Sequence, residues 1–151
     1  MEWLDFPRGA LIAFDTAPLI YLIEENPTWL PVVLPFFEAI TRGDLQGITS
    51  TVTLTEVLIH PLRRKDSSLA EKYRRVLLNA RNVNVLPVSV AIAEQAALLR
   101  AQYGLRTPDA IQLATAIEAG ASSFLTNDDQ LSLPGTLRII SLKQLLPASP
   151  Q

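Results

Sequence analysis

The chain has 151 residues, of which 48% are hydrophobic, and it carries a formal net charge of −2 at pH 7. This length fits one domain over residues 1–151, with a folded core over residues 10–142 and short flexible ends. The absence of cysteine excludes disulfide bonds and thiolate metal sites. The acidic balance excludes a protein that binds nucleic acid through bulk positive charge alone. Because neither a signal peptide nor a membrane-spanning stretch is recognisable, we expect a cytoplasmic protein that does not enter a membrane.

Short apolar runs alternate with helix signals along the chain. Strands are predicted at residues 10–14, 47–50, 82–86, 123–126 and 137–140. Helices are predicted at residues 18–23, 28–40, 53–59, 67–79, 90–103, 108–118 and 142–146. Pro61 is expected to end the third helix, and residues 147–151 are expected to fray. The alternation predicts an α/β fold with a mostly parallel sheet covered by helices on both faces.

Four acidic residues stand where an apolar run gives way to a helix signal: Asp15, Glu56, Asp109 and Asp128. In a parallel α/β sheet, such positions lie together at the carboxyl ends of the strands, where these folds place their sites. Four carboxylates gathered there would repel one another unless a divalent cation joined them. The pattern therefore predicts a metal site of the magnesium type, which points to phosphodiester chemistry.

Helix capping is the alternative explanation for each of these acids. Glu56 lies three residues after Thr53, a spacing that matches a capping box. Asp109 follows Thr107, the expected N-cap, and Pro108, so it could simply be a first-turn acid favoured by the helix dipole. The other two acids could each satisfy backbone N–H groups of the turn that follows. Capping explains each position separately, but the metal site explains why all four lie on one edge.

Four short blocks of sequence resemble the motifs of the PIN-domain nucleases, and most closely those of the VapC-type toxins of toxin–antitoxin pairs. They are residues 14–16 (FDT), 55–57 (TEV), 107–110 (TPDA) and 125–128 (LTND). The likeness extends over residues 10–142, and its last two blocks are the most specific. It implies a three-layer α/β/α fold whose central parallel sheet has about five strands.

The resemblance also implies a function. Asp15, Glu56, Asp109 and Asp128 match the family's acidic quartet, which makes them the expected catalytic residues and ligands of Mg²⁺ or Mn²⁺. The expected activity is endoribonuclease cleavage of tRNA, rRNA or mRNA, by the toxin of a type II toxin–antitoxin pair. A cognate antitoxin and a second copy of the chain, forming a homodimer, are the implied protein partners.

Further residues were assigned supporting roles or left open. Thr126 matches a hydroxyl that supports the family's metal site, and Thr16 is a neighbouring polar group that could help it. Arg106 is the candidate for binding a substrate phosphate. Asp129 adds a fifth acid where the family commonly has a basic residue, and of Asp128 and Asp129 the family match favours Asp128 as the one that faces the metal. A set of basic residues either contacts the RNA backbone or forms a solvated helix face, and the solvated face is favoured: Arg63, Arg64, Lys65, Lys72, Arg74, Arg75 and Arg81.

Other classes of protein were weighed against the nuclease. A catalytically silent module on the same fold, which binds RNA or protein without cleaving it, would show a degraded acidic set, and here the set is complete. A dehalogenase-like phosphatase needs a second Asp at position 17, which is Ala17. A signalling receiver needs an Asp at the end of its third strand, where this chain has Leu86 and Pro87.

Overall fold

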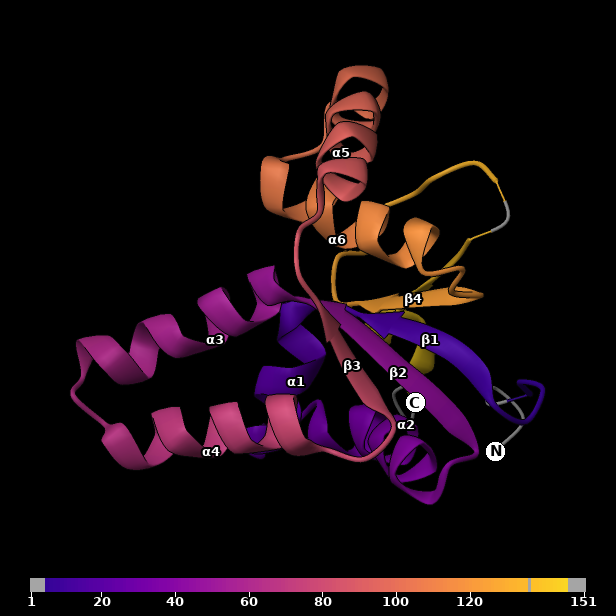
Figure 1. Ribbon diagram of the computed structural model, residues 1–151. Coiled ribbons are helices and arrows are strands. Elements are labelled where there is room, and N and C mark those ends of the chain that lie inside the picture. Colours follow the sequence, from indigo (N-terminus) through magenta and orange to yellow (C-terminus); the bar gives the residue numbers. More distant parts are fainter. Residues whose placement is uncertain (1–4, 136, 147–151) are drawn as a thin grey trace, which may run out of the picture.

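The computed structural model describes residues 5–135 and 137–146, and the expectation of a frayed tail lies outside them (Figure 1). The described residues form a sheet of five parallel strands in the order β3-β2-β1-β4-β5. The strands are β1 (Ala10–Phe14), β2 (Leu45–Ser50), β3 (Val83–Leu86), β4 (Ser123–Thr126) and β5 (Arg138–Ser141). The predicted α/β class and parallel sheet are therefore confirmed.

Helices cover both faces of this sheet, as predicted. They are α1 (Thr16–Ile23), α2 (Leu30–Arg42), α3 (Thr51–Arg63), α4 (Ser67–Asn79), α5 (Val90–Tyr103) and α6 (Thr107–Glu118), followed by the short 3₁₀ helix η2 (Leu142–Leu145). Figure 1 shows α5 and α6 on one side of the sheet and α1 to α4 on the other. Among the described residues, no helix has the length and apolar character that a membrane crossing requires.

The alternation of side chains along β1 builds the two apolar layers of the core. Ile12 and Phe14 pack in a cluster with residues of α1, α2 and α4, such as Val33 and Tyr73. Ala13 points to the other face and packs with residues of α5 and α6. Because β1 is buried on both faces, its sequence is an uninterrupted apolar run.

The strand order fixes where a site can form. The chain passes from β1 to β2 and β3 on one side, and then crosses to β4 and β5 on the other. The switch point of this topology lies between the carboxyl ends of β1 and β4, where open α/β sheets bind ligands. Asp15 directly follows β1, and Asp128 is the second residue after β4. Two of the predicted acids therefore flank the switch point.

The prediction that Pro61 ends its helix is wrong. Helix α3 begins at Thr51 and continues through Pro61 to Arg63. The proline ring is buried, and α3 packs along α4, so tertiary packing offsets the backbone hydrogen bond that proline cannot make. The helix ends only at the turn that carries Arg64 and Lys65.

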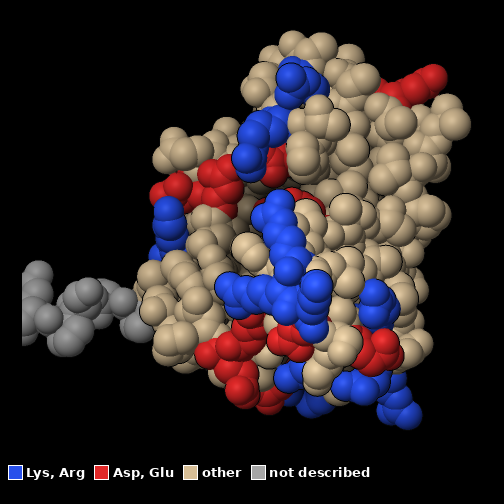
Figure 2. All heavy atoms as spheres, turned by 90° about the vertical axis from the view of Figure 1, so that its left-hand side faces the viewer, with Lys and Arg blue, Asp and Glu red and all other residues tan. Residues whose placement is uncertain are grey.

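Charge is unevenly distributed over the surface. The end of α3 and the turn that follows it carry three exposed basic residues, Arg63, Arg64 and Lys65. Figure 2 views the molecule from the side of this turn and shows acidic side chains recessed between basic ones. The small net charge of the chain thus conceals regions of both signs.

Candidate active site

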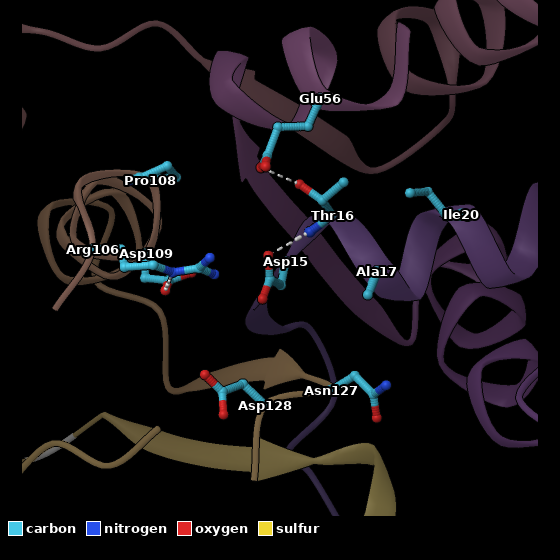
Figure 3. Close-up of a pocket in the computed structure, with 10 residues that line it drawn as sticks. All are labelled: Asp15, Thr16, Ala17, Ile20, Glu56, Arg106, Pro108, Asp109, Asn127 and Asp128. Atoms are coloured by element: carbon cyan, nitrogen blue, oxygen red, sulfur yellow. Dashed lines mark hydrogen bonds and ion pairs between the residues drawn. The ribbon is translucent and has the colours of Figure 1, made fainter. Parts of the chain in front are cut away.

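The four predicted acids line one cavity at the carboxyl edge of the sheet. The cavity has a volume of about 420 Å³, and its walls are formed by Asp15, Thr16, Ala17, Ile20, Glu56, Arg106, Pro108, Asp109, Asn127 and Asp128. Figure 3 shows Glu56, Asp109 and Asp128 arranged around Asp15. These acids come from the end of β1, from α3, from α6 and from the loop after β4, so the fold gathers residues far apart in the sequence.

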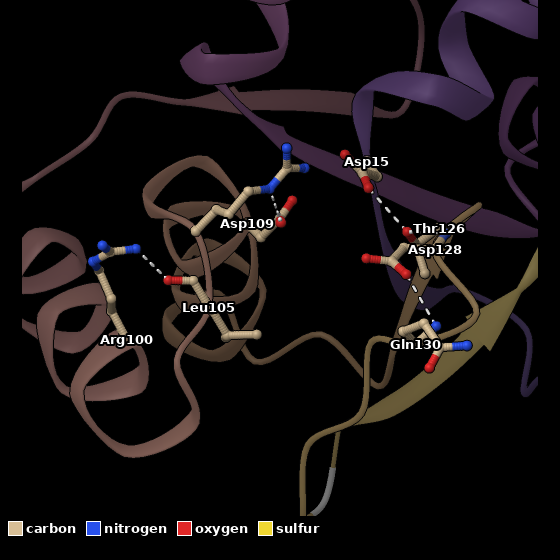
Figure 4. A network of polar contacts seen from close by, with 8 residues as sticks. Asp15, Arg100, Leu105, Asp109, Thr126, Asp128 and Gln130 are labelled. Carbon is tan, nitrogen blue, oxygen red and sulfur yellow. Dashed lines mark hydrogen bonds and ion pairs between the residues drawn. The ribbon is translucent and has the colours of Figure 1, made fainter.

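Asp15 is held in a fixed orientation by two hydrogen bonds. It is the N-cap of α1, where its Oδ1 accepts a hydrogen bond from the Thr16 N–H at 2.6 Å. Its Oδ2 accepts a hydrogen bond from the Thr126 hydroxyl at 2.9 Å (Figure 4). The side chain of Asp15 therefore both caps α1 and lines the cavity.

Burial raises the pKa of Asp15 above its ordinary value of 3.8, and this outweighs the hydrogen bonds from Thr16 and Thr126, which lower it. The negative charges of Asp109 and Glu56 raise the pKa further. A desolvated carboxylate among like charges is the setting that a cation would relieve.

Glu56 faces the cavity and does not complete a capping box. Its Oε1 accepts a hydrogen bond from the Thr16 hydroxyl at 2.7 Å. The N-cap of α3 is Ser50, whose Oγ accepts a hydrogen bond from the Val52 N–H at 3.1 Å. Thr53 lies inside the first turn of the helix, so the capping-box explanation of Glu56 is wrong. Its spacing from Thr53 was coincidental.

Asp109 forms an ion pair with Arg106 at the wall of the cavity. The distance from Arg106 Nε to Asp109 Oδ2 is 3.2 Å, with the arginine side chain 82% exposed and the aspartate 19% exposed. The expected N-cap, Thr107, is instead the first residue of α6, and Arg106 occupies the N-cap position without a side-chain cap. Arg106 thus lies beside the cavity, where it was predicted to meet a substrate phosphate.

The structure distinguishes Asp128 from Asp129. Asp128 lines the cavity, and its Oδ1 accepts a hydrogen bond from the Gln130 N–H at 2.9 Å. Asp129 instead forms an ion pair with Lys143 at 3.4 Å, and this contact lowers the pKa of Asp129. The hydroxyl of Thr126, the predicted supporting residue, links Asp15 after β1 to Asp128 after β4. It donates to Asp15 and accepts a hydrogen bond from the Asp128 N–H at 3.1 Å.

The donor set of the cavity fits a hard divalent cation. Carboxylate oxygens are the ligands that Mg²⁺ and Mn²⁺ prefer. The desolvated Asp15 is one of the carboxylates that the cavity offers. In the part of the chain that the structure describes, no three acidic or histidine side chains are arranged closely enough to hold a metal ion as they stand. The cavity therefore supplies suitable ligands without a preformed coordination shell.

Two polar residues near the cavity were not identified as candidates from the sequence. Asn127 lines the wall and donates a hydrogen bond from Nδ2 to the Tyr21 hydroxyl at 2.7 Å, which joins the loop after β4 to α1. Gln112 lies behind the wall and is 2% exposed. Its only signal in the sequence is a polar residue between Ile111 and Leu113 in an otherwise apolar stretch of α6.

Comparisons with known proteins agree with this geometry. Residues 12–135 match the PIN domain family. No curated protein matches the chain. These results confirm the resemblance seen in the four sequence blocks at the level of the family.

Solved structures with a similar fold include several toxin–antitoxin proteins. A toxin–antitoxin complex from Klebsiella pneumoniae is 28% identical, with 89% of this chain and 98% of that chain covered and a TM-score of 0.65. VapBC2 from Rickettsia felis, bound to a DNA fragment from its promoter, is 17% identical, with 87% and 98% covered and a TM-score of 0.68. VapC20 from Mycobacterium tuberculosis, a toxin that cleaves the sarcin–ricin loop, is 19% identical, with 75% and 86% covered and a TM-score of 0.61. At these low identities, the Rickettsia felis and Mycobacterium tuberculosis structures show only that the fold is similar.

Proposed function

Because the chain belongs to the PIN domain family, we propose that it is a metal-dependent nuclease that cleaves RNA internally, with Asp15, Glu56, Asp109 and Asp128 as its catalytic residues. The observation that carries this proposal is the convergence of these four acids, from four separate segments, on one cavity. Their oxygen-only donor set supports Mg²⁺ or Mn²⁺ as the cofactor.

In the proposed reaction, these four carboxylates would hold the cation, which would supply Lewis-acid stabilisation of the charge on the phosphoryl oxygens. Two hydrogen bonds hold Asp15, and the Thr16 hydroxyl orients Glu56, so these carboxylates are positioned before substrate arrives. A cavity carboxylate accepts a proton from the attacking water while the oxygen of the water forms a bond to phosphorus. The bond from phosphorus to the 3′ oxygen breaks, and that oxygen takes up a proton from solvent. The products carry a 5′-phosphate and a 3′-hydroxyl.

The proposed substrate is tRNA, rRNA or mRNA, and exposed basic residues, one of them in the cavity wall, support a nucleic acid. Arg106 lies in the cavity wall and would contact a phosphate near the cleaved bond. Arg63, Arg64 and Lys65 are exposed at the end of α3 and in the turn to α4, where they would contact the backbone farther along the strand. Local patches of this kind would allow a chain of net charge −2 to bind RNA.

We further propose that the protein is the toxin of a type II toxin–antitoxin pair, acting in the cytoplasm as a homodimer. The support is the similarity to the Klebsiella pneumoniae toxin–antitoxin complex, which covers 98% of that chain. A cognate antitoxin would then be its protein partner.

The experiment that tests the proposal is incubation of the purified protein with a mixed pool of tRNA and rRNA, with Mn²⁺ or Mg²⁺ and with a chelator. We expect discrete fragments with the metal, none with the chelator, and 5′-phosphate ends at the cuts. A folded protein that binds RNA in this pool without cleaving it at any metal concentration would contradict the nuclease and favour a silent binding module.

A further inference from the structure

Gln112 connects the helix that carries Asp109 to the elements that carry Glu56 and Asp15. It lies on α6 one turn after Asp109, with its side chain 2% exposed. Its Nε2 is 2.7 Å from the Thr53 hydroxyl on α3 and 3.5 Å from the Thr16 hydroxyl on α1. A buried amide is costly unless its groups find partners, so these contacts call for an explanation.

The direction of the hydrogen bonds around Thr53 can be deduced by counting hydrogens. The Thr49 hydroxyl donates its one hydrogen to the Phe14 carbonyl at 2.8 Å, because a carbonyl can only accept. In the 2.8 Å contact between the Thr49 and Thr53 hydroxyls, Thr53 must therefore be the donor. The Thr53 oxygen then faces Gln112 with lone pairs only.

The same count applies to Thr16. Its hydroxyl donates its hydrogen to Glu56 Oε1 at 2.7 Å, so its oxygen also faces Gln112 as an acceptor. The group that meets both threonines must be a double donor. The NH₂ of an amide is such a group. The side chain of Gln112 must therefore point its nitrogen, and not its oxygen, at the two threonines.

We infer that Gln112 is a positioning residue: its amide holds the Thr16 and Thr53 hydroxyls so that the hydrogen of Thr16 points at Glu56. This inference rests on the proposed function, because it concerns the orientation of a proposed metal ligand. Without the amide, the Thr16 hydroxyl is free to turn toward Thr53, whose oxygen lies 3.4 Å away, and Glu56 loses its fixed partner. Groups that orient metal ligands typically contribute about 10- to 100-fold to metal affinity or activity.

The test compares Mn²⁺ affinity by calorimetry in variants of the full chain. Gln112→Met keeps an unbranched side chain and removes both N–H donors, so we expect Mn²⁺ binding to weaken by about tenfold, the lower end of that range. Gln112→His offers one of the two N–H donors again and should recover only part of the affinity. The matched control is Thr115→Val, since Thr115 is equally buried on α6 but its hydroxyl bonds only to the Ile111 carbonyl of its own helix.

A purely structural role gives a different result. Gln112→Met would then lower the melting temperature, while the folded protein would bind Mn²⁺ as tightly as the wild type does, and this outcome would overturn the inference. A wild-type protein that neither binds Mn²⁺ nor cleaves RNA would instead overturn the proposed function, and the inference with it.

A measurement on the wild-type protein covers the case in which Gln112→Met does not fold. The side-chain NH₂ protons of Gln112 can be followed by NMR during a titration with Mg²⁺. We expect both resonances to shift as the cation binds, because Thr16 links this amide to Glu56. Resonances that stay unchanged at saturating Mg²⁺ would contradict the inference.

Discussion

The carboxylate of Asp15 lies where its surroundings oppose its charge. Burial raises its pKa, and the neighbouring Asp109 and Glu56 raise it further. The hydrogen bonds from Thr16 and Thr126 fix its orientation but do not cancel these effects. Such a site lowers the stability of the metal-free protein, which is a common consequence of gathering groups for function.

The first prediction concerns Asp15→Asn in the presence of a chelator. An acid whose pKa is higher in the folded than in the unfolded protein binds more protons when folded, so stability falls as the pH rises from 3.8 through the folded value. Asparagine keeps an acceptor for the Thr16 N–H without the charge. We therefore expect the variant to be more stable than the wild type at neutral pH and to lose this advantage in acid.

Urea denaturation at a series of pH values measures this difference. Asp129→Asn is the control, because Lys143 lowers the pKa of Asp129 and removal of that charge should not stabilise the protein. An advantage of Asp15→Asn that is the same at all pH values would show that the charge of Asp15 is not its cause.

The second prediction concerns the ion pair between Arg106 and Asp109. Because the arginine is 82% exposed, the pair is of the surface type, which contributes less than about 1 kcal/mol. Arg106→Gln should therefore strengthen Mn²⁺ binding by no more than about fivefold, since Asp109 no longer has a competing cation. The same change should raise the KM for RNA, because a phosphate contact is lost.

Calorimetry and steady-state cleavage measure the two effects separately. Arg100→Gln is the matched control, because Arg100 donates to the Leu105 carbonyl at 2.6 Å and does not line the cavity. Weaker Mn²⁺ binding by Arg106→Gln, or an unchanged KM, would contradict the role assigned to Arg106.

The sequence indicated which single residues gather at the cavity, but not how they are connected. Strand ends in a parallel sheet have fixed positions, so the locations of Asp15 and Asp128 followed from the alternation of strands and helices. The family match favoured Asp128 over Asp129, but the ion pair between Asp129 and Lys143 could not be predicted from the sequence. Gln112 was missed because the partners that explain its burial come from α1 and α3.

At the scale of elements, boundaries were predicted well where local signals decide them and poorly where packing does. The glycines that end α2 and α5 both adopt positive φ angles, of 86° at Gly43 and 66° at Gly104, as expected for helix C-termini. Pro61 is a stop signal in the sequence, but its ring is buried and α3, packed along α4, continues past it. The predicted start of α3 at Thr53 is too late because Ser50 both ends β2 and caps α3, so the helix follows the strand directly.

The third prediction separates capping from metal binding on α3. Ser50→Ala removes the N-cap and should lower the free energy of unfolding by about 1 kcal/mol, with Mn²⁺ affinity unchanged. Glu56→Gln should do the opposite, weakening Mn²⁺ binding while leaving stability nearly unchanged, because Glu56 does not cap the helix. Denaturation and calorimetry on both variants measure this. A loss of stability in Glu56→Gln with unchanged metal affinity would contradict the role of Glu56 as a metal ligand.

At the scale of the whole molecule, the fold places one apolar layer on each side of the sheet and leaves its carboxyl edge to polar groups. The cavity forms where the topology changes direction, between β1 and β4, and α3 and α6 bring two further acids to it. Overall composition could not show this, because a net charge of −2 does not say where the 13 basic and 15 acidic residues lie. The account therefore depends on where the charges lie.

The most direct test of the central claim compares RNA cleavage by Asp109→Asn and Asp129→Asn with that of the wild type, at equal Mn²⁺. Both changes remove one carboxylate charge, but only Asp109 lines the cavity, while Asp129 faces Lys143. Since loss of a group beyond the metal ligands costs about 10- to 100-fold, Asp109→Asn is expected to lower cleavage by more than about 100-fold. Asp129→Asn is expected to cleave as the wild type does. Equal activity of the two folded variants would contradict the assignment of the cavity as the active site.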